Sequence, residues 1–157
     1  MKPILVLGLG NRLMMDDGVG VDIVEALMAE DPIDSRVEYL VGETDLDYCL
    51  DAIENRKFVI IIDAVLTGLQ PGEVSVLSLS EMAPNKPGLS LHHLHFLYLL
   101  HTLDLQKKGV LVGIEPFNID FYFGLSEAMK LRFECLLHEV RLIVSNQVKK
   151  YFETPFI

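Results

Sequence analysis

The chain has 157 residues, of which 50% are hydrophobic and 23% are charged, and its formal net charge is −10. This length predicts a single domain, residues 1–157, that buries roughly 70% of its unfolded surface. The negative charge disfavours nucleic acid and anionic membrane surfaces as partners. With two cysteines, no signal peptide and no apolar span of about 18 residues, the sequence predicts a cytoplasmic protein whose reduced thiols, Cys49 and Cys135, lie on apolar helix faces.

The first segment of the chain predicts a strand, a loop and a helix. Residues 3–7 are an apolar run rich in branched side chains, and apolar residues recur at helical spacing within 21–28. The glycine-punctuated loop at 8–20 separates them and carries two adjacent carboxylates, Asp16 and Asp17. Ligands of open α/β sheets usually bind at the loop that follows the first strand. The acidic pair is therefore a candidate functional site.

Two other interpretations of this loop need weighing. Gly8 and Gly10 resemble the start of a dinucleotide-binding fingerprint, but Leu13 stands where the third glycine is required. The Gly-x-x-x-x-Gly-Lys-Ser/Thr phosphate loop is also absent. Alternatively, Asp16 or Asp17 caps the following helix, because Asp accepts N–H hydrogen bonds at that position. A capping role for one acid leaves the other without an explanation.

Three elements follow the first helix: a strand at 36–41, a helix at 45–54 capped by Thr44 or Asp45, and a strand at 58–62. The 58–62 segment is apolar without alternation, which is typical of a central parallel strand buried on both faces. It ends at Asp63, whose carboxylate needs a partner or solvent. We expect Asp63 to lie near the loop that follows the first strand.

The second half of the chain predicts a strand at 73–79, a helix from Ser90 to about residue 103, a strand at 110–114, and a long helix beginning at Ser126. The 73–79 segment alternates, which indicates a half-exposed strand. Because no helix separates it from the preceding strand, it is expected to be an antiparallel edge strand. Strands alternating with helices in this way predict an α/β fold.

A metal site can be built from these elements. Asp17 and Asp63 would lie at one edge of the sheet and would meet a histidine from the helix that carries His92, His93 and His95. Three protein ligands with an open position are typical of a functional metal site, and mixed nitrogen and oxygen donors suit nickel or zinc. Helical spacing puts His92 in the first turn facing the loop, with His95 on the same face.

The usual hydrolase signatures are absent from the sequence. It has no Gly-x-Ser-x-Gly elbow and no His-Glu-x-x-His pair, and neither cysteine lies in a nucleophile motif. Composition and spacing alone therefore indicate an acidic metal-site candidate on an α/β sheet.

Six motifs in order carry a resemblance to a known family: Gly8-Leu9-Gly10-Asn11, Asp16-Asp17-Gly18-Val19-Gly20, Ile62-Asp63-Ala64, a histidine after Ser90, Gly113-Ile114-Glu115-Pro116 and Gly124-Leu125-Ser126. Across nearly the whole chain, the sequence resembles the hydrogenase maturation endopeptidases. These enzymes trim the C-terminal tail of the nickel-iron hydrogenase large-subunit precursor. The resemblance implies a three-layer α/β/α sandwich with a five-stranded, mostly parallel sheet and one antiparallel edge strand.

The resemblance also implies roles for individual residues. Asp17, Asp63 and His92 would bind nickel, which the precursor carries, and the two acids would belong to the catalytic centre. Either a metal-bound water attacks the peptide carbonyl, or a carboxylate such as Asp16 activates the water as a base. Some relatives have Glu where this chain has Asp17, and three histidines stand where the pattern needs one. The competing hypothesis is a non-catalytic, nickel-dependent binding or checkpoint module for hydrogenase assembly.

Overall fold

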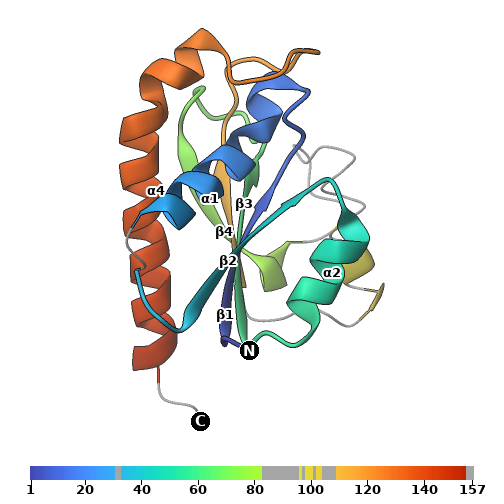
Figure 1. The fold of residues 1–157 in the computed structure, drawn as a ribbon, viewed down its shortest axis with the longest axis vertical. Coiled ribbons are helices and arrows are strands. Elements are labelled where there is room, and N and C mark those ends of the chain that lie inside the picture. Colours follow the sequence, from blue (N-terminus) through green and yellow to red (C-terminus); the bar gives the residue numbers. More distant parts are fainter. Residues whose placement is uncertain (31–32, 83–95, 97, 101, 104–108, 155–157) are drawn as a thin grey trace.

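The computed structural model describes residues 1–30, 33–82, 96, 98–100, 102–103 and 109–154. Within these residues, five strands form one sheet in the order β2-β1-β3-β5-β4 (Figure 1). The strands are β1 (Ile4–Leu9), β2 (Val37–Glu43), β3 (Phe58–Ala64), β4 (Val74–Ser78) and β5 (Gly109–Ile114). β1 pairs in parallel with β2 and β3, and β3 pairs in parallel with β5. β4 pairs antiparallel with β5 at one edge, which confirms the predicted fold class.

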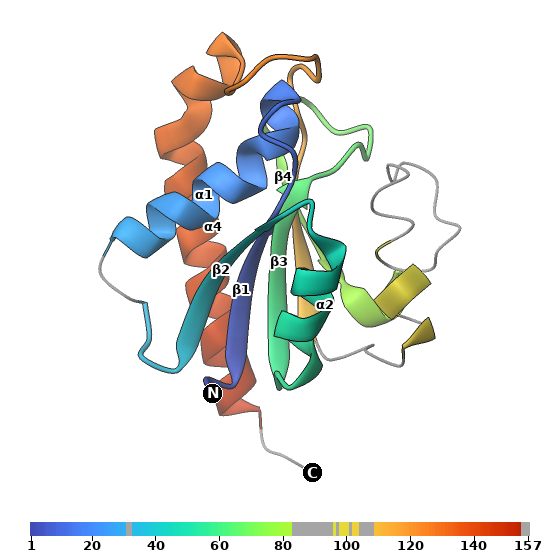
Figure 2. The ribbon, with the colours of Figure 1, turned by 45° about the vertical axis from the view of Figure 1, so that its right-hand side comes forward.

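Helices cover both faces of the sheet. The named helices are α1 (Val19–Ala29), α2 (Leu46–Glu54) and α4 (Glu127–Glu153), with short 3-10 turns at η1 (Met15–Gly18) and η2 (Leu79–Glu81). Alternate residues of β1 serve the two faces: Ile4 and Val6 pack in the core with α1 and α4, while Leu5 and Leu7 pack in the core with α2. Figure 2 shows α2 on the side of the sheet opposite to α1 and α4.

The third strand is longer than predicted. β3 continues beyond Ile62 through Asp63 and Ala64, because β5 runs alongside and Asp63 pairs with Gly113. Asp63 is therefore one of the last residues of a buried parallel strand and is not part of the loop after it. The predicted burial of this strand on both faces is confirmed, since Val59 to Ile62 are all 2% exposed or less.

The predicted helix after Ser90 lies partly outside the described residues. Phe96, residues 98–100 and Thr102 are helical, which agrees with the predicted extent. Phe96 and Leu100 are buried in the core that contains α2. The three histidines of this segment, His92, His93 and His95, lie outside the described residues.

Helix α4 corrects one expectation about the cysteines. Its buried stripe consists of Met129, Leu136, Leu137, Val140, Val144 and Val148. Cys135 lies one position before Leu136, which rotates it by about 100° around the helix from that buried residue, and its side chain is exposed. The prediction that Cys135 lies on an apolar core face is therefore wrong, whereas Cys49 is buried as predicted.

None of the described helices combines the length and hydropathy needed to cross a bilayer.

Candidate site at the carboxyl edge of the sheet

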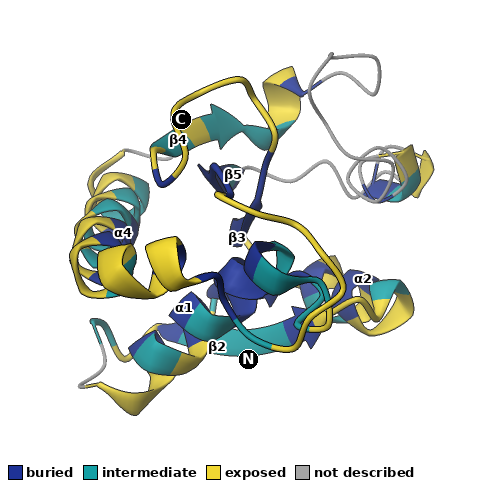
Figure 3. Cartoon of the chain, turned by 90° about the horizontal axis from the view of Figure 1, so that it is seen from above, coloured by how far each residue is buried: buried dark blue, intermediate teal, exposed yellow. Residues whose placement is uncertain are grey.

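The parallel strands β1, β3 and β5 end at the same edge of the sheet, and Figure 3 looks down on that edge. An acidic residue lies at the end of each of these three strands or in the segment that follows it. Asp16 and Asp17 lie in η1, which follows β1, Asp63 lies at the end of β3, and Glu115 directly follows β5. The predicted meeting of these chain segments at one edge is thus present in the fold.

Glycines bring the segments of this edge into close contact. A Cβ atom on Gly10, which has φ of 137°, would lie 2.0 Å from the carbonyl oxygen of Asp17. A Cβ atom on Gly20 would lie 2.2 Å from the carbonyl oxygen of Ile62. Both distances are far shorter than any allowed contact, so only glycine permits this packing. The first turn of α1 consequently sits against the backbone of β3 directly beside Asp63.

Asp17 and Asp63 differ in exposure. Asp17 is half-buried, and its Oδ2 accepts a hydrogen bond from the backbone N–H of Asn11 at 3.1 Å. That bond fixes the carboxylate against the backbone of its own loop. Asp63 is 4% exposed. Carboxylate oxygens are common ligands of divalent cations, so both acids stay candidate ligands.

Asp16 is the most buried acid of the site, with 0% exposure, and both of its oxygens accept hydrogen bonds. Oδ2 accepts from the N–H groups of Phe117 and Asn118, each at 3.0 Å, and from Oγ of Ser126 at 2.8 Å. Oδ1 accepts from the N–H of Ser126 at 2.8 Å. Asp16 thereby ties the loop after β1 to the loop after β5 and to the N-terminus of α4. This geometry favours a positioning role over that of a base.

The helix-capping interpretation of the acidic pair is wrong for α1. The N-cap position of α1 is Gly18, and no side chain caps it. Asp16 instead supports the N-terminus of α4. It accepts hydrogen bonds from Ser126, the N-cap residue of α4, and Oγ of Ser126 in turn accepts from the N–H of Met129 at 3.2 Å. The acid therefore stabilises a helix more than 100 residues further along the chain, which local sequence patterns do not reveal.

Glu115 also lies at this edge. It belongs to the Gly113-Ile114-Glu115-Pro116 motif, but the sequence predicted no role for it. Its Oε2 accepts from the N–H and Oγ1 of Thr67 at 3.1 and 2.7 Å, and its Oε1 accepts from the N–H of Gly68 at 3.2 Å. Its side chain thus holds the loop that follows Asp63. The sequence signal that could have identified Glu115 is an acid at the end of an apolar run, the same pattern that singled out Asp63.

The predicted third metal ligand lies outside the described residues, as do both of its alternatives in the 92–95 segment. Within the part of the chain that the structure describes, no group of three or more His, Cys, Asp or Glu side chains is arranged to hold a metal ion. The roles of Asp17, Asp63 and His92 as metal ligands therefore stay predictions.

The buried cysteine, Cys49, is a poor nucleophile. Burial, followed by the negative charges of Asp45 and Asp63, raises the pKa of the Cys49 thiol to about 12. The thiolate is the nucleophilic form, so Cys49 is unsuited to attack a peptide bond at neutral pH.

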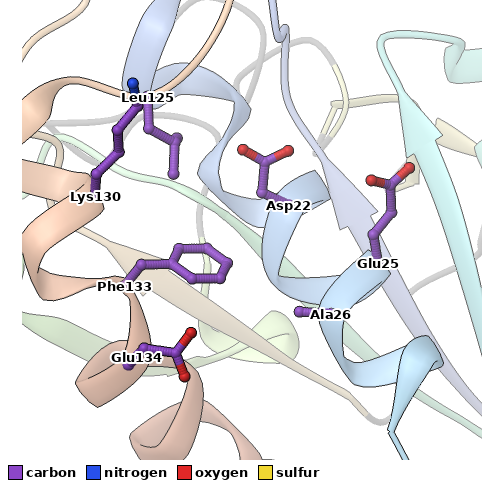
Figure 4. A pocket seen from close by; sticks show the side chains of 7 residues that line it. All are labelled: Asp22, Glu25, Ala26, Leu125, Lys130, Phe133 and Glu134. Carbon is purple, nitrogen blue, oxygen red and sulfur yellow. The ribbon is translucent and has the colours of Figure 1, made fainter.

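A separate hollow of about 500 Å³ lies between α1 and α4 (Figure 4). Its lining residues are Asp22, Glu25, Ala26, Leu125, Lys130, Phe133 and Glu134. Burial raises the pKa of Asp22, and the nearby Arg12 guanidinium partly offsets that effect. Arg12 also forms an ion pair with Glu25 and one of 3.4 Å with Glu43, so it links the site loop to this hollow. None of the acids predicted for the metal site lines the hollow.

The fold and the site define an α/β sandwich protein with an acidic site at the carboxyl edge of a mostly parallel sheet. The family model HycI, described as hydrogenase maturation protease, matches residues 21–142. The chain belongs to the hydrogenase maturation protease family.

Individual relatives agree with this assignment. The hydrogenase 2 maturation protease of Escherichia coli (strain K12) is 34% identical over 148 residues, which cover 87% of each protein. The hydrogenase expression/formation protein HupD of Thiocapsa roseopersicina is 35% identical over 128 residues, covering 77% of this chain but 58% of HupD. The structure of the hydrogenase maturating endopeptidase HYBD from E. coli matches with a TM-score of 0.76 and 33% identity, covering 92% of this chain and 93% of that one.

Proposed function

We propose that this chain is an endopeptidase that removes the C-terminal extension of a nickel-loaded nickel-iron hydrogenase large-subunit precursor. The observation that carries the proposal is the placement of Asp17 and Asp63 on adjacent segments of one sheet edge, in a chain of the hydrogenase maturation protease family. Nickel is cargo of the substrate in this proposal. The proposal includes a cytoplasmic location, with which the two free cysteines are consistent.

Recognition of the nickel uses three side chains in this proposal. Asp17 and Asp63 provide carboxylate oxygens, and His92 provides an imidazole nitrogen, a donor set that suits nickel. Binding the metal at this edge holds the attached precursor tail beside the two acids, so that hydrolysis becomes effectively intramolecular. A water molecule then attacks the scissile carbonyl, and the leaving amine takes up a proton. Asp17 and Asp63 belong to the catalytic centre, whereas Asp16 acts as a positioning residue.

The test is the mass of the nickel-loaded precursor after incubation with the protein. The wild-type chain is expected to remove a short C-terminal peptide, and the nickel-free precursor is expected to stay intact. Asp17→Asn and Asp63→Asn remove the negative charge that attracts the cation while keeping the side-chain shape, so both should lose binding and cleavage. Asp47→Asn is the matched control, because Asp47 is an exposed acid in the first turn of α2.

The same experiment separates an enzyme from a binding module. A nickel-dependent checkpoint protein would form a stable complex with the precursor and leave its mass unchanged. Unimpaired binding of the nickel-loaded precursor by Asp17→Asn would refute the ligand assignment.

A further inference from the structure

The loop between β5 and α4, residues 117–123 and called the aromatic loop below, exposes a cluster of large apolar side chains. Phe121, Tyr122 and Phe123 are 79%, 56% and 70% exposed. Leu13, on the loop that follows β1, is a half-exposed apolar neighbour of this segment. Contiguous exposed apolar side chains on a soluble protein usually mark an interaction surface.

The exposure of the aromatic loop is built into the fold. The N–H of Met15 donates to the carbonyl oxygen of Tyr122, and the N–H of Tyr122 donates to the carbonyl oxygen of Leu13, both at 3.0 Å. Asp16 adds the two hydrogen bonds from Phe117 and Asn118 described above. The loop is thus bonded to the segment that carries Asp17, and it borders the candidate site.

Acidic residues border the aromatic loop and limit what can occupy it. Asp120 lies within the loop, and Glu127, with a side chain 88% exposed, follows it and forms an ion pair of 3.1 Å with Lys130. Leu125, two residues past Phe123, lines the hollow of Figure 4, which three further acids and one lysine, Lys130, also line. A second copy of this chain, which also carries a net charge of −10, would be repelled. Lys and Arg side chains are attracted both by these acids and by exposed aromatic faces.

We propose that the aromatic loop is the docking surface for the hydrogenase large-subunit precursor and that it binds an apolar segment of the precursor flanked by Lys or Arg. This inference rests on the proposed function, because the site beside the loop determines which protein is presented there. Because the backbone of the loop is already fixed by these hydrogen bonds, less loop entropy is lost on binding, and large aromatic side chains are effective anchors. The loop would then select the precursor, while the acids at the sheet edge detect its nickel.

The test compares Phe121→Gln/Phe123→Gln with wild type in steady-state cleavage of the nickel-loaded precursor. Loss of two exposed anchors is expected to raise KM by about tenfold or more, with kcat changed much less. The fold should survive, because both side chains are largely exposed. Leu142→Gln is the matched control: Leu142 is 52% exposed halfway along α4, and its substitution should leave KM unchanged. Added salt should raise the wild-type KM, since charged groups border the surface.

A second measurement does not depend on catalysis. The chain has no Trp, so Phe121→Trp expressed with 5-fluorotryptophan gives one ¹⁹F signal in the aromatic loop. Adding the nickel-loaded precursor should shift or broaden that signal. No change in the signal, or a KM for the double variant equal to that of the Leu142 control, would overturn the docking proposal. A wild-type chain that neither binds nor cuts the precursor would instead overturn the proposed function.

Discussion

Replacing Asp16 by Asn tests whether this acid positions the site or performs chemistry. The carboxylate accepts hydrogen bonds from three backbone N–H groups and one hydroxyl, at distances of 2.8 to 3.0 Å and with 0% exposure. An amide has one acceptor oxygen. If that oxygen takes the place of Oδ2, the amide nitrogen replaces Oδ1 and points its hydrogens at the N–H of Ser126.

The expected loss of stability follows from these contacts. One buried donor left without an acceptor costs about 1–3 kcal/mol. The three bonds that remain change from charged to neutral acceptors, which lowers their combined contribution by a further ~2 kcal/mol. Asp16→Asn should therefore destabilise the fold by about 3–5 kcal/mol. For a chain of this length, that corresponds to a fall in Tm of about 10 °C.

The assay is thermal and urea unfolding of Asp16→Asn and Asp17→Asn, with precursor binding and cleavage measured on the folded fraction. Asp17 is half-buried, and its carboxylate accepts a single hydrogen bond among the described residues, from the backbone N–H of Asn11 at 3.1 Å, so its Asn variant should lose less than about 1 kcal/mol of stability while losing recognition. Asp16→Asn should instead lower stability strongly and weaken precursor binding only in part, with residual cleavage per folded molecule. A fully stable Asp16→Asn variant that binds the precursor but does not cut it would refute the positioning role and assign Asp16 as the base.

Three further outcomes are expected. Gly20→Ala should destabilise the chain by several kcal/mol in urea unfolding, because its Cβ would overlap the carbonyl oxygen of Ile62 at 2.2 Å. Iodoacetamide at pH 8 should alkylate exposed Cys135 but not buried Cys49, giving one adduct by mass spectrometry in the folded protein and two after unfolding. Because burial raises the pKa of Cys49 from 9.0 to about 12, the unfolded chain loses that thiol proton first. The free energy of unfolding should therefore fall as pH rises from 9 toward 12, by at most about 1.4 kcal/mol per pH unit, and Cys49→Ala should lack this component.

The features of the fold that the sequence predicted depend on local periodicity. The unbroken apolar run at 58–62 identified a central parallel strand, and the alternating segment at 73–79 identified an antiparallel edge strand. Both assignments are confirmed, because burial on two faces or on one face leaves a direct pattern in the chain. The end of β3 was placed too early, since the partner strand that extends the ladder past Ile62 is about 50 residues away in sequence.

The features that the sequence did not predict depend on contacts between distant segments. Nothing near Asp16 indicates that its partners are Phe117, Asn118 and Ser126. Likewise, Glu115 bonds to Thr67, which lies in another loop. Local spacing can place an acid at the end of a strand, but it cannot distinguish an acid saturated with hydrogen bonds from one that can bind a ligand.

The adjacent acids Asp16 and Asp17 show how such a division of roles follows from geometry. Two neighbouring residues in a tight 3-10 turn point in different directions, so one carboxylate can face the interior while the other remains accessible. The inward acid, Asp16, fixes the loops on either side of the edge, and one of these is the aromatic loop. The loops around Asp17 are therefore already ordered in the folded protein, before any cation binds. Such preorganisation strengthens binding of a charged ligand, because the cost of ordering the loops is met during folding. Disorder of the aromatic loop in Asp16→Asn should consequently weaken precursor docking as well as stability, which links the two proposals through one buried carboxylate.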